Sequence, residues 1–105
     1  MDAIQGSNYV VHTASPFYFN NQTDEELIKP AVDGTLSVMK ACNAHNVKRC
    51  VLTSSCAAIG MGYARDDPER PEDGFDESHW SKLDGPGMNG YFKSKTLAEK
   101  AAWDY

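Results

Sequence analysis

The sequence has no long apolar run, no cysteine framework and no concentration of basic residues, and each absence argues against a class of protein. No run of about 18 apolar residues occurs, so we expect no membrane-spanning segment. Ten Lys and Arg against fifteen Asp and Glu give a net charge of −5, and the basic residues are scattered. That pattern argues against a nucleic-acid partner. The first residues also lack the basic start and apolar core of a secretory signal.

Cysteine is scarce as well. Cys42, Cys50 and Cys56 are odd in number and form no Cys-x-x-Cys pair, which favours reduced thiols in a cytoplasmic protein over a disulfide framework or a metal site. Cys56 could be a nucleophile with His12 as its base, but a small buried thiol is the better interpretation. The acidic stretch 66–77 lacks the ligand pattern of an EF-hand and is expected to be a solvated loop.

The sequence contains two short β-branched runs, residues 9–14 and 49–55. Such runs are typical of strands buried on both faces of a parallel sheet. Between them, Thr23 and Glu26 form the Thr-x-x-Glu pattern of a capping box. Apolar residues then recur at helical spacing from Asp24, which predicts a helix of about twenty residues. Strand, helix and strand make a βαβ unit, which crosses right-handed into a parallel sheet.

Three residues should shape this helix. Pro30 removes a backbone hydrogen bond and should kink it. Gly34 weakens the helix, and its expected use is to let the helix lie close to the sheet. Asn46 is expected to end the helix in the left-handed conformation.

The remaining chain is predicted to be a long loop over residues 57–90 and a last helix over residues 91–105. A loop of this length is uncommon in a compact domain and usually functional. His79 and Trp80 could line the edge of a substrate pocket in this loop. A solvent-exposed His79 and a Trp80 packed against the protein are about equally expected. Two strands and two helices cannot close a parallel sheet, so residues 1–105 are interpreted as an internal fragment of a larger α/β domain.

Tyr91 and Lys95 form a Tyr-x-x-x-Lys pattern in the last helix, and side chains four residues apart share a helix face. An ammonium beside a phenol favours the phenolate, so such a pair can pass a proton near neutral pH. The pattern alone is weak, because a surface helix with an ordinary lysine and a packed tyrosine would look the same.

Hydroxyl and small residues stand where the two strands should end. Thr53, Ser54 and Ser55 follow the second strand, and Thr13, Ala14 and Ser15 follow the first. The carboxyl ends of parallel strands are where open α/β sheets bind ligands. A hydroxyl there can donate to a carbonyl oxygen that gains charge, although Thr-Ser-Ser at a strand end is more often turn chemistry.

Four motifs, taken in order, resemble one family. They are His-Thr-Ala-Ser-Pro at 12–16, Pro-Ala-Val-x-Gly-Thr at 30–35, Val-Lys-Arg-x-Val-x-Thr-Ser-Ser at 47–55 and Tyr-x-x-Ser-Lys-Thr-Leu-Ala-Glu-x-Ala-Ala-Trp at 91–103. Together they are similar to the extended short-chain dehydrogenases/reductases, in the group of dihydroflavonol 4-reductase, cinnamoyl-CoA reductase and anthocyanidin reductase. The resemblance implies a partial NAD(P)-binding Rossmann fold: a βαβ unit plus the catalytic helix of a doubly wound parallel sheet.

The resemblance also implies a Ser–Tyr–Lys reductase that interconverts a small ketone or aldehyde and its alcohol. Tyr91 would be the acid/base, Lys95 would assist it and hold the nicotinamide ribose, and Ser55 would position the carbonyl, with Ser54 the second choice. The cofactor would be NADP or NAD, with NADPH favoured. Thr13, Ala14, Ser15, Thr53 and Ser54 would line it together with Tyr91 and Lys95.

Departures from the family pattern leave two alternatives open. The glycine-rich turn of the N-terminal βαβ unit, the residue that separates NAD from NADP, and the C-terminal substrate region do not occur in this sequence. Many members also have Asn where Asp33 or Ser37 stands. The chain could therefore be a non-catalytic truncated gene product. It could also be an interaction partner of a full-length reductase, pairing through an exposed sheet edge with Val10 and Val11 at its centre.

Overall fold

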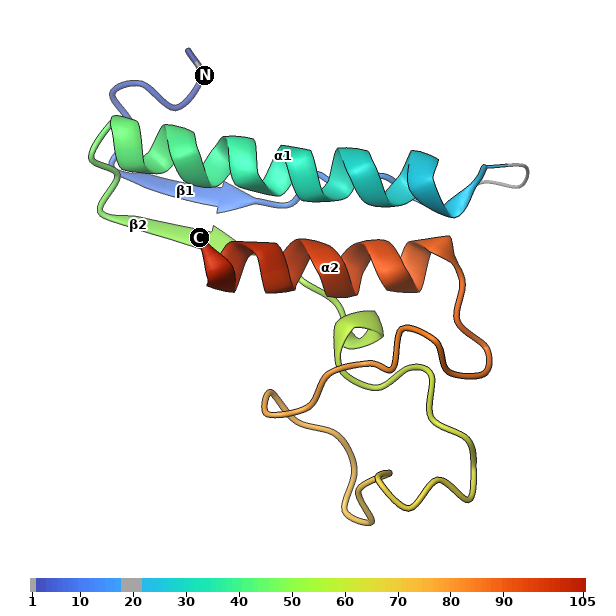
Figure 1. The fold of residues 1–105 in the computed structure, drawn as a ribbon. Helices are drawn as coiled ribbons and strands as arrows, with labels where there is room; N and C mark the ends of the chain where they lie inside the picture. The colour runs from blue at the N-terminus through green and yellow to red at the C-terminus, as the bar shows by residue number, and fades with distance from the viewer. Residues whose placement is uncertain (1, 18–21) are drawn as a thin grey trace.

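A computed structural model describes residues 2–17 and 22–105. Its elements follow in the order β1 (Tyr9–His12), α1 (Asp24–Ala44), β2 (Arg49–Leu52), a short 3-10 helix η1 (Cys56–Ala58) and α2 (Gly90–Asp104) (Figure 1). β1 and β2 pair in parallel, with Val10 opposite Cys50 and Val11 opposite Val51. The predicted βαβ unit is therefore confirmed. Both strands end earlier than predicted, so the segments Thr13–Ser15 and Thr53–Ser55 lie beyond them.

The start and end of α1 follow the sequence signals. The Glu26 amide donates to Thr23 Oγ1 over 3.2 Å, and the Thr23 amide donates to Glu26 Oε2 over 2.9 Å, which completes the capping box. Asn46 has a φ of 53°, so the left-handed stop is confirmed. α1 continues through Pro30 to Ala44. The predicted use of Gly34 is wrong, because a Cβ added there would meet no atom within 4 Å.

The core lies mainly between α1 and α2, which pack side by side (Figure 1). Leu27 is 0% exposed and is the one large aliphatic side chain that is fully buried among the described residues. A Cβ added at Gly90 would lie 3.0 Å from Leu27 Cδ1, which shows how closely the start of α2 approaches α1. The other buried side chains are small, apart from that of Lys95: Ala31, Thr35, Ala41, Cys42, Ala57, Ala58, Ser81, Ser94, Thr96 and Ala98.

The prediction that both strands are buried on both faces is wrong for the described residues. Exposure alternates along each strand, and Tyr9, Val11 and Val51 are 68%, 67% and 51% exposed. Alternation of this kind means that one face of the sheet is covered and the other meets solvent. The apolar face of Tyr9, Val11 and Val51 is therefore open in the part of the chain that the structure describes.

The long loop between η1 and α2 is irregular, as predicted, but it is built on specific contacts. The Ser81 hydroxyl donates to the Ala57 carbonyl over 2.7 Å and accepts from the Met61 amide over 2.8 Å. Gly62 and Gly85 are in close contact: a Cβ added at Gly85 would lie 1.7 Å from the Gly62 carbonyl oxygen. These contacts close the loop into the lobe that extends away from α2 in Figure 1.

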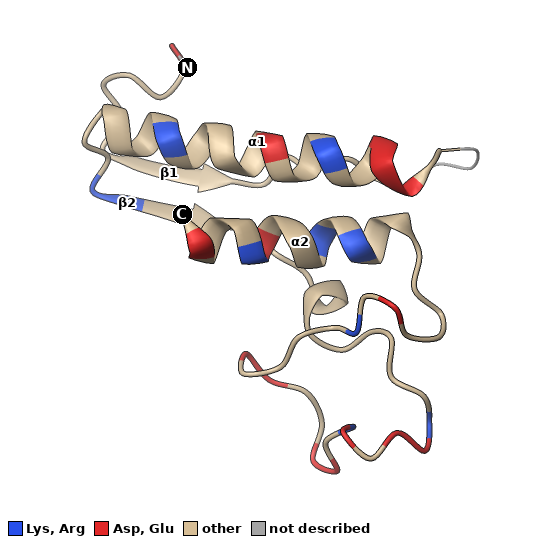
Figure 2. Ribbon diagram, in the orientation of Figure 1, with Lys and Arg blue, Asp and Glu red and all other residues tan. Residues whose placement is uncertain are grey.

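Charge is spread over the molecule rather than gathered on one element. Acidic residues recur along the loop and α1, while Lys and Arg are distributed over both helices, β2 and the loop (Figure 2). Across residues 2–17 and 22–105, neither helix combines the length and apolar character that crossing a bilayer would require.

Candidate functional site

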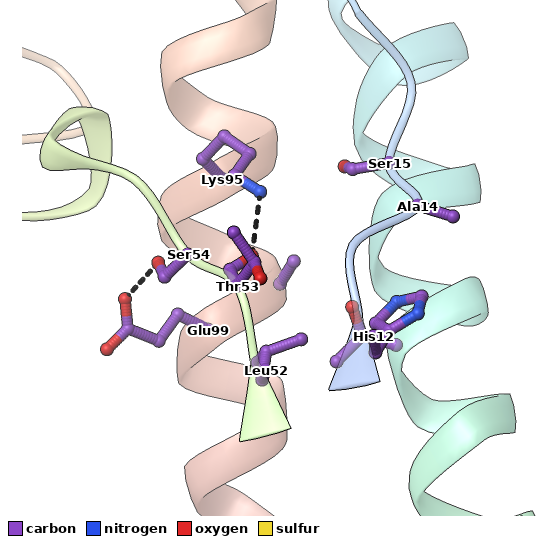
Figure 3. A pocket seen from close by; sticks show the side chains of 10 residues that line it. His12, Ala14, Ser15, Leu52, Thr53, Ser54, Lys95 and Glu99 are labelled. Atoms are coloured by element: carbon purple, nitrogen blue, oxygen red, sulfur yellow. Dashed lines mark hydrogen bonds between the residues drawn. The ribbon is translucent and has the colours of Figure 1, made fainter. Parts of the chain in front are cut away.

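Lys95 lies one turn into α2, and its ammonium group points toward the end of β2. Its Nζ donates to the Thr53 carbonyl oxygen over 3.3 Å (Figure 3). The residue is only 8% exposed, and this burial lowers the pKa of Lys95 from its ordinary value, while the negative charge of Glu99 opposes the shift. Burial of an ammonium group at a strand end is costly for a purely structural residue, and it marks this position as a candidate site.

A small hollow brings the ends of both strands together around Lys95 (Figure 3). Its volume is about 10 Å³, and its lining comprises His12, Ala14, Ser15, Thr35, Leu52, Thr53, Ser54, Lys95, Ala98 and Glu99. Four of the five strand-end residues expected to line a cofactor therefore meet Lys95 here; Thr13 does not line the hollow. The arrangement follows from the parallel pairing, which places both carboxyl ends at one edge of the sheet.

The two serines after β2 have different partners. The Ser54 hydroxyl donates a short hydrogen bond to Glu99 Oε2 (Figure 3). Ser55 is the N-cap of η1, and its Oγ accepts from the Ala57 amide over 3.1 Å. The Ser55 hydroxyl proton has no acceptor among residues 2–17 and 22–105, so it can donate to a ligand. The Ser54 hydroxyl already donates its proton to Glu99, so it has none left to donate to a ligand.

Tyr91 is the second residue of α2, one helical turn before Lys95, and the Asn89 side chain caps that turn. Its ring packs against Phe17, with ring centroids 5.3 Å apart, and against Phe92 at 6.2 Å. The phenol oxygen of Tyr91 donates no hydrogen bond within the part of the chain that the structure describes. Tyr91 and Ser55 do not line the hollow.

Two titratable residues of the hollow were not assigned to the site from the sequence. His12 ends β1, and its pKa is lowered by burial and by the nearby charge of Lys95. Glu99 lies one turn beyond Lys95 on the same helix, and the spacing Tyr91, Lys95, Glu99 at every fourth position was a signal that could have placed it on this face.

The interpretation of Cys56 as a buried thiol is wrong, because Cys56 is exposed at the start of η1. Cys42 is the buried cysteine, and burial together with a hydrogen bond to Cys50 raises its pKa, which favours an inert thiol. Within residues 2–17 and 22–105, no three His, Cys, Asp or Glu side chains gather closely enough to hold a metal ion.

His79 and Trp80 belong to the loop and its contact with α2. His79 Nδ1 accepts from the Asp76 amide over 3.0 Å. The Lys100 Nζ lies 5.2 Å from the centroid of the Trp80 ring, and the Trp80 backbone carbonyl accepts from the Tyr63 hydroxyl over 2.6 Å. These contacts support the packing interpretation of Trp80, and neither residue lines the hollow around Lys95.

Comparisons with known proteins agree on one family. Residues 1–103 match the family described as 3-beta hydroxysteroid dehydrogenase/isomerase. The chain is 44% identical over 111 residues to a dihydroflavonol 4-reductase of Arabidopsis thaliana, covering 99% of this chain and 28% of the relative. It is 42% identical over 113 residues to an anthocyanidin reductase of Vitis vinifera, covering 97% and 31%.

Among solved structures, the fold is similar to that of a yeast methylglyoxal/isovaleraldehyde reductase in complex with NADPH. The TM-score is 0.74 at 34% identity, and the match covers 92% of this chain and 30% of the yeast protein. The chain thus spans about 30% of the length of the relatives that it matches.

Proposed function

Because the chain belongs to the 3-beta hydroxysteroid dehydrogenase/isomerase family of extended short-chain dehydrogenases/reductases, we propose that it carries the proton-transfer part of an NADPH-dependent carbonyl reductase. The family and the partial Rossmann fold expected from the sequence are confirmed. The activity, the choice of NADPH over NADH and the role of each residue are what we propose.

The observation that carries the proposal is the buried Lys95 at the joined strand ends. Its ammonium reaches the Thr53 carbonyl, Ala14 and Ser15 lie across the hollow from it, and Tyr91 is one turn away. In the proposed reaction Tyr91 gives its proton to a substrate oxygen and later recovers one from solvent. Lys95 has two further ammonium protons, which suit the ribose hydroxyls of a nicotinamide nucleotide.

The residues at the strand ends fit a flat ring that lies across the hollow rather than inside it. A volume of about 10 Å³ has room for a single water molecule. Ala14 and Ser15 are small and exposed, which allows a ligand to approach the backbone after β1. NADPH, when bound, would supply the hydride that a carbonyl carbon accepts; this chain's own contribution is the proton from Tyr91 and the orientation of the carbonyl oxygen.

Ser55, rather than Ser54, is the hydroxyl that we assign to the substrate carbonyl. A hydroxyl has one proton, and Ser54 gives its proton to Glu99. Ser55 accepts from the Ala57 amide, and accepting a hydrogen bond makes a hydroxyl a better donor. A donor aimed at an oxygen that gains negative charge lowers the barrier to hydride transfer.

A chimera tests the proposal. Residues 1–105 replace the matched segment of the yeast methylglyoxal/isovaleraldehyde reductase, and NADPH-dependent reduction of methylglyoxal is measured. We expect Ser55→Ala to lower kcat/KM by roughly 100-fold, the loss seen when one preorganised donor is removed. Ser54→Ala is the matched control and should lower it less. A folded chimera that binds NADPH without turnover, or a Ser54→Ala loss equal to that of Ser55→Ala, would contradict the assignment.

A second role, pairing with another chain through the sheet, is favoured by the open apolar face of Tyr9, Val11 and Val51. The accessible surface is 7088 Å², against about 5,800 Å² expected for a compact monomer of this mass. The sheet has two strands among the described residues, so each also has an outer edge without a strand partner there. Sedimentation velocity should show species larger than the monomer, and Val11→Lys should shift them toward monomer. A monomer at all concentrations would exclude the role.

A further inference from the structure

Glu99 connects α2 to the strand-end segment that follows β2. Its Oε2 accepts from the Ser54 hydroxyl, and its Oε1 accepts from the Trp103 indole Nε1 over 3.3 Å. Lys95, Glu99 and Trp103 are spaced four residues apart, so they lie on one face of the helix. Both carboxylate oxygens are therefore occupied, and the carboxylate is held facing the residues that precede Ser55.

The hollow around Lys95 contains few charged groups. Its titratable lining residues are His12 from β1 and Lys95 and Glu99 from α2; the segment after β2 contributes the Thr53 carbonyl, and α1 contributes the neutral Thr35. Glu99 is thus the one carboxylate of this lining. It lies one helical turn from Lys95 and lines the same hollow, and it is itself only half-buried, so its charge can act on Lys95 without a large desolvation cost of its own.

We propose that Glu99 is a positioning residue with two separable roles: its hydrogen bond to Ser54 fixes the Thr53–Ser55 segment against α2, and its negative charge keeps the buried Lys95 ammonium protonated. The inference rests on the proposed function for its purpose, because a fixed segment and a charged Lys95 are what Ser55 and Tyr91 need in order to act. Ser54 is then a strut rather than a substrate ligand.

The two roles separate in substitutions of Glu99. Glu99→Gln removes the charge but keeps a carbonyl oxygen that can accept from Ser54. Glu99→Ala removes the charge and the acceptor. Ser54→Ala removes the hydrogen bond and keeps the charge. Asp104→Asn is the matched control, because it removes one carboxylate from the same helix at an exposed position about 14 Å from Lys95 along the axis, whereas Glu99 is about 6 Å from it.

The charge is tested by labelling the dilute 105-residue chain with acetic anhydride over a range of pH, with each lysine read by mass spectrometry. In the unaltered chain Lys95 should titrate below the ordinary value of a lysine, because it is buried. Glu99→Gln should lower the midpoint of Lys95 further, and Asp104→Asn should not. Unfolding would remove burial and move the midpoint up, so the direction of the shift separates the loss of charge from a loss of structure.

The hydrogen bond between Ser54 and Glu99 is tested by amide hydrogen exchange in the peptide that spans residues 53–58. Ser54→Ala and Glu99→Ala should increase its exchange rate, while Glu99→Gln should leave it near that of the unaltered chain. An upward or absent shift of Lys95 in Glu99→Gln, or equal exchange in all variants, would overturn the proposal. Neither readout requires turnover or cofactor, so failure here differs from failure of the reductase assignment, which the chimera decides.

Discussion

Leu27→Ala should remove much of the stability of the chain. Leu27 is 0% exposed, and the residues buried with it between α1 and α2 are mostly Ala, Ser and Thr. Replacement of a buried leucine by alanine costs about 2–5 kcal/mol, with the higher values where neighbours cannot close the cavity. Small neighbours on two rigid helices have little freedom to move inward, so we expect about 3 kcal/mol or more.

That loss is large against the stability available. A chain of 105 residues with an average stability of about 0.05 kcal/mol per residue unfolds with about 5 kcal/mol, and the excess exposed surface argues for this low end of the range. With a urea dependence of about 1.5 kcal/mol/M, a loss of about 3 kcal/mol moves the unfolding midpoint by about 2 M.

The assay is urea unfolding followed by far-ultraviolet circular dichroism at low protein concentration. Val11→Ala is the matched control, because Val11 is 67% exposed and its truncation should change stability by less than about 0.5 kcal/mol. A Leu27→Ala chain whose midpoint moves no further than that of Val11→Ala would refute the view that the α1–α2 contact holds the fold together.

Three further outcomes follow from local geometry. Gly85→Ala should open the lobe to proteolysis within residues 57–89, because the added Cβ would lie 1.7 Å from a backbone oxygen of Gly62 that cannot move aside alone; an unchanged cleavage rate would contradict this. Gly34→Ala should raise the free energy of unfolding by about 0.5–1 kcal/mol, since the added methyl group meets no atom within 4 Å; a lower midpoint temperature in thermal unfolding would contradict this. Folding lowers the pKa of Lys95, so between the folded-state pKa and 10.5 the unfolded chain binds more protons, and the free energy of unfolding should rise with pH in this window. Urea unfolding of Lys95→Met should lack this rise, and a rise equal to that of the unaltered chain would contradict the burial of Lys95.

Local signals in the sequence predicted the elements that carry the site. The capping pair Thr23 and Glu26, the stop at Asn46 and the apolar runs around Val10 and Val51 each depend on residues close in the chain, and the structure contains all of them. Parallel pairing of the strands then brings their ends together, so the meeting of Ala14, Ser15 and Thr53 near Lys95 needed only the topology.

The failures concern contacts between segments. An apolar run shows which faces of a strand can be buried, but exposure depends on what packs there, and Val11 has no such cover among the described residues. The Ser54–Glu99 hydrogen bond joins residues 45 positions apart, and no local spacing predicts it. Cys56 is exposed because η1 turns it outward, and the sequence after Ser55 gave no sign of that turn.

The most direct test of the central claim is the rate of hydride transfer in the chimera that carries Tyr91→Phe, measured in a single turnover with bound NADPH. Removal of the proton donor should slow the step by about 100-fold or more while NADPH affinity stays nearly unchanged. Tyr9→Phe, at a site 68% exposed on the sheet, should leave the rate as it was. A Tyr91→Phe chimera that transfers hydride at the unaltered rate would show that Tyr91 is not the acid and that the buried Lys95 serves some other purpose.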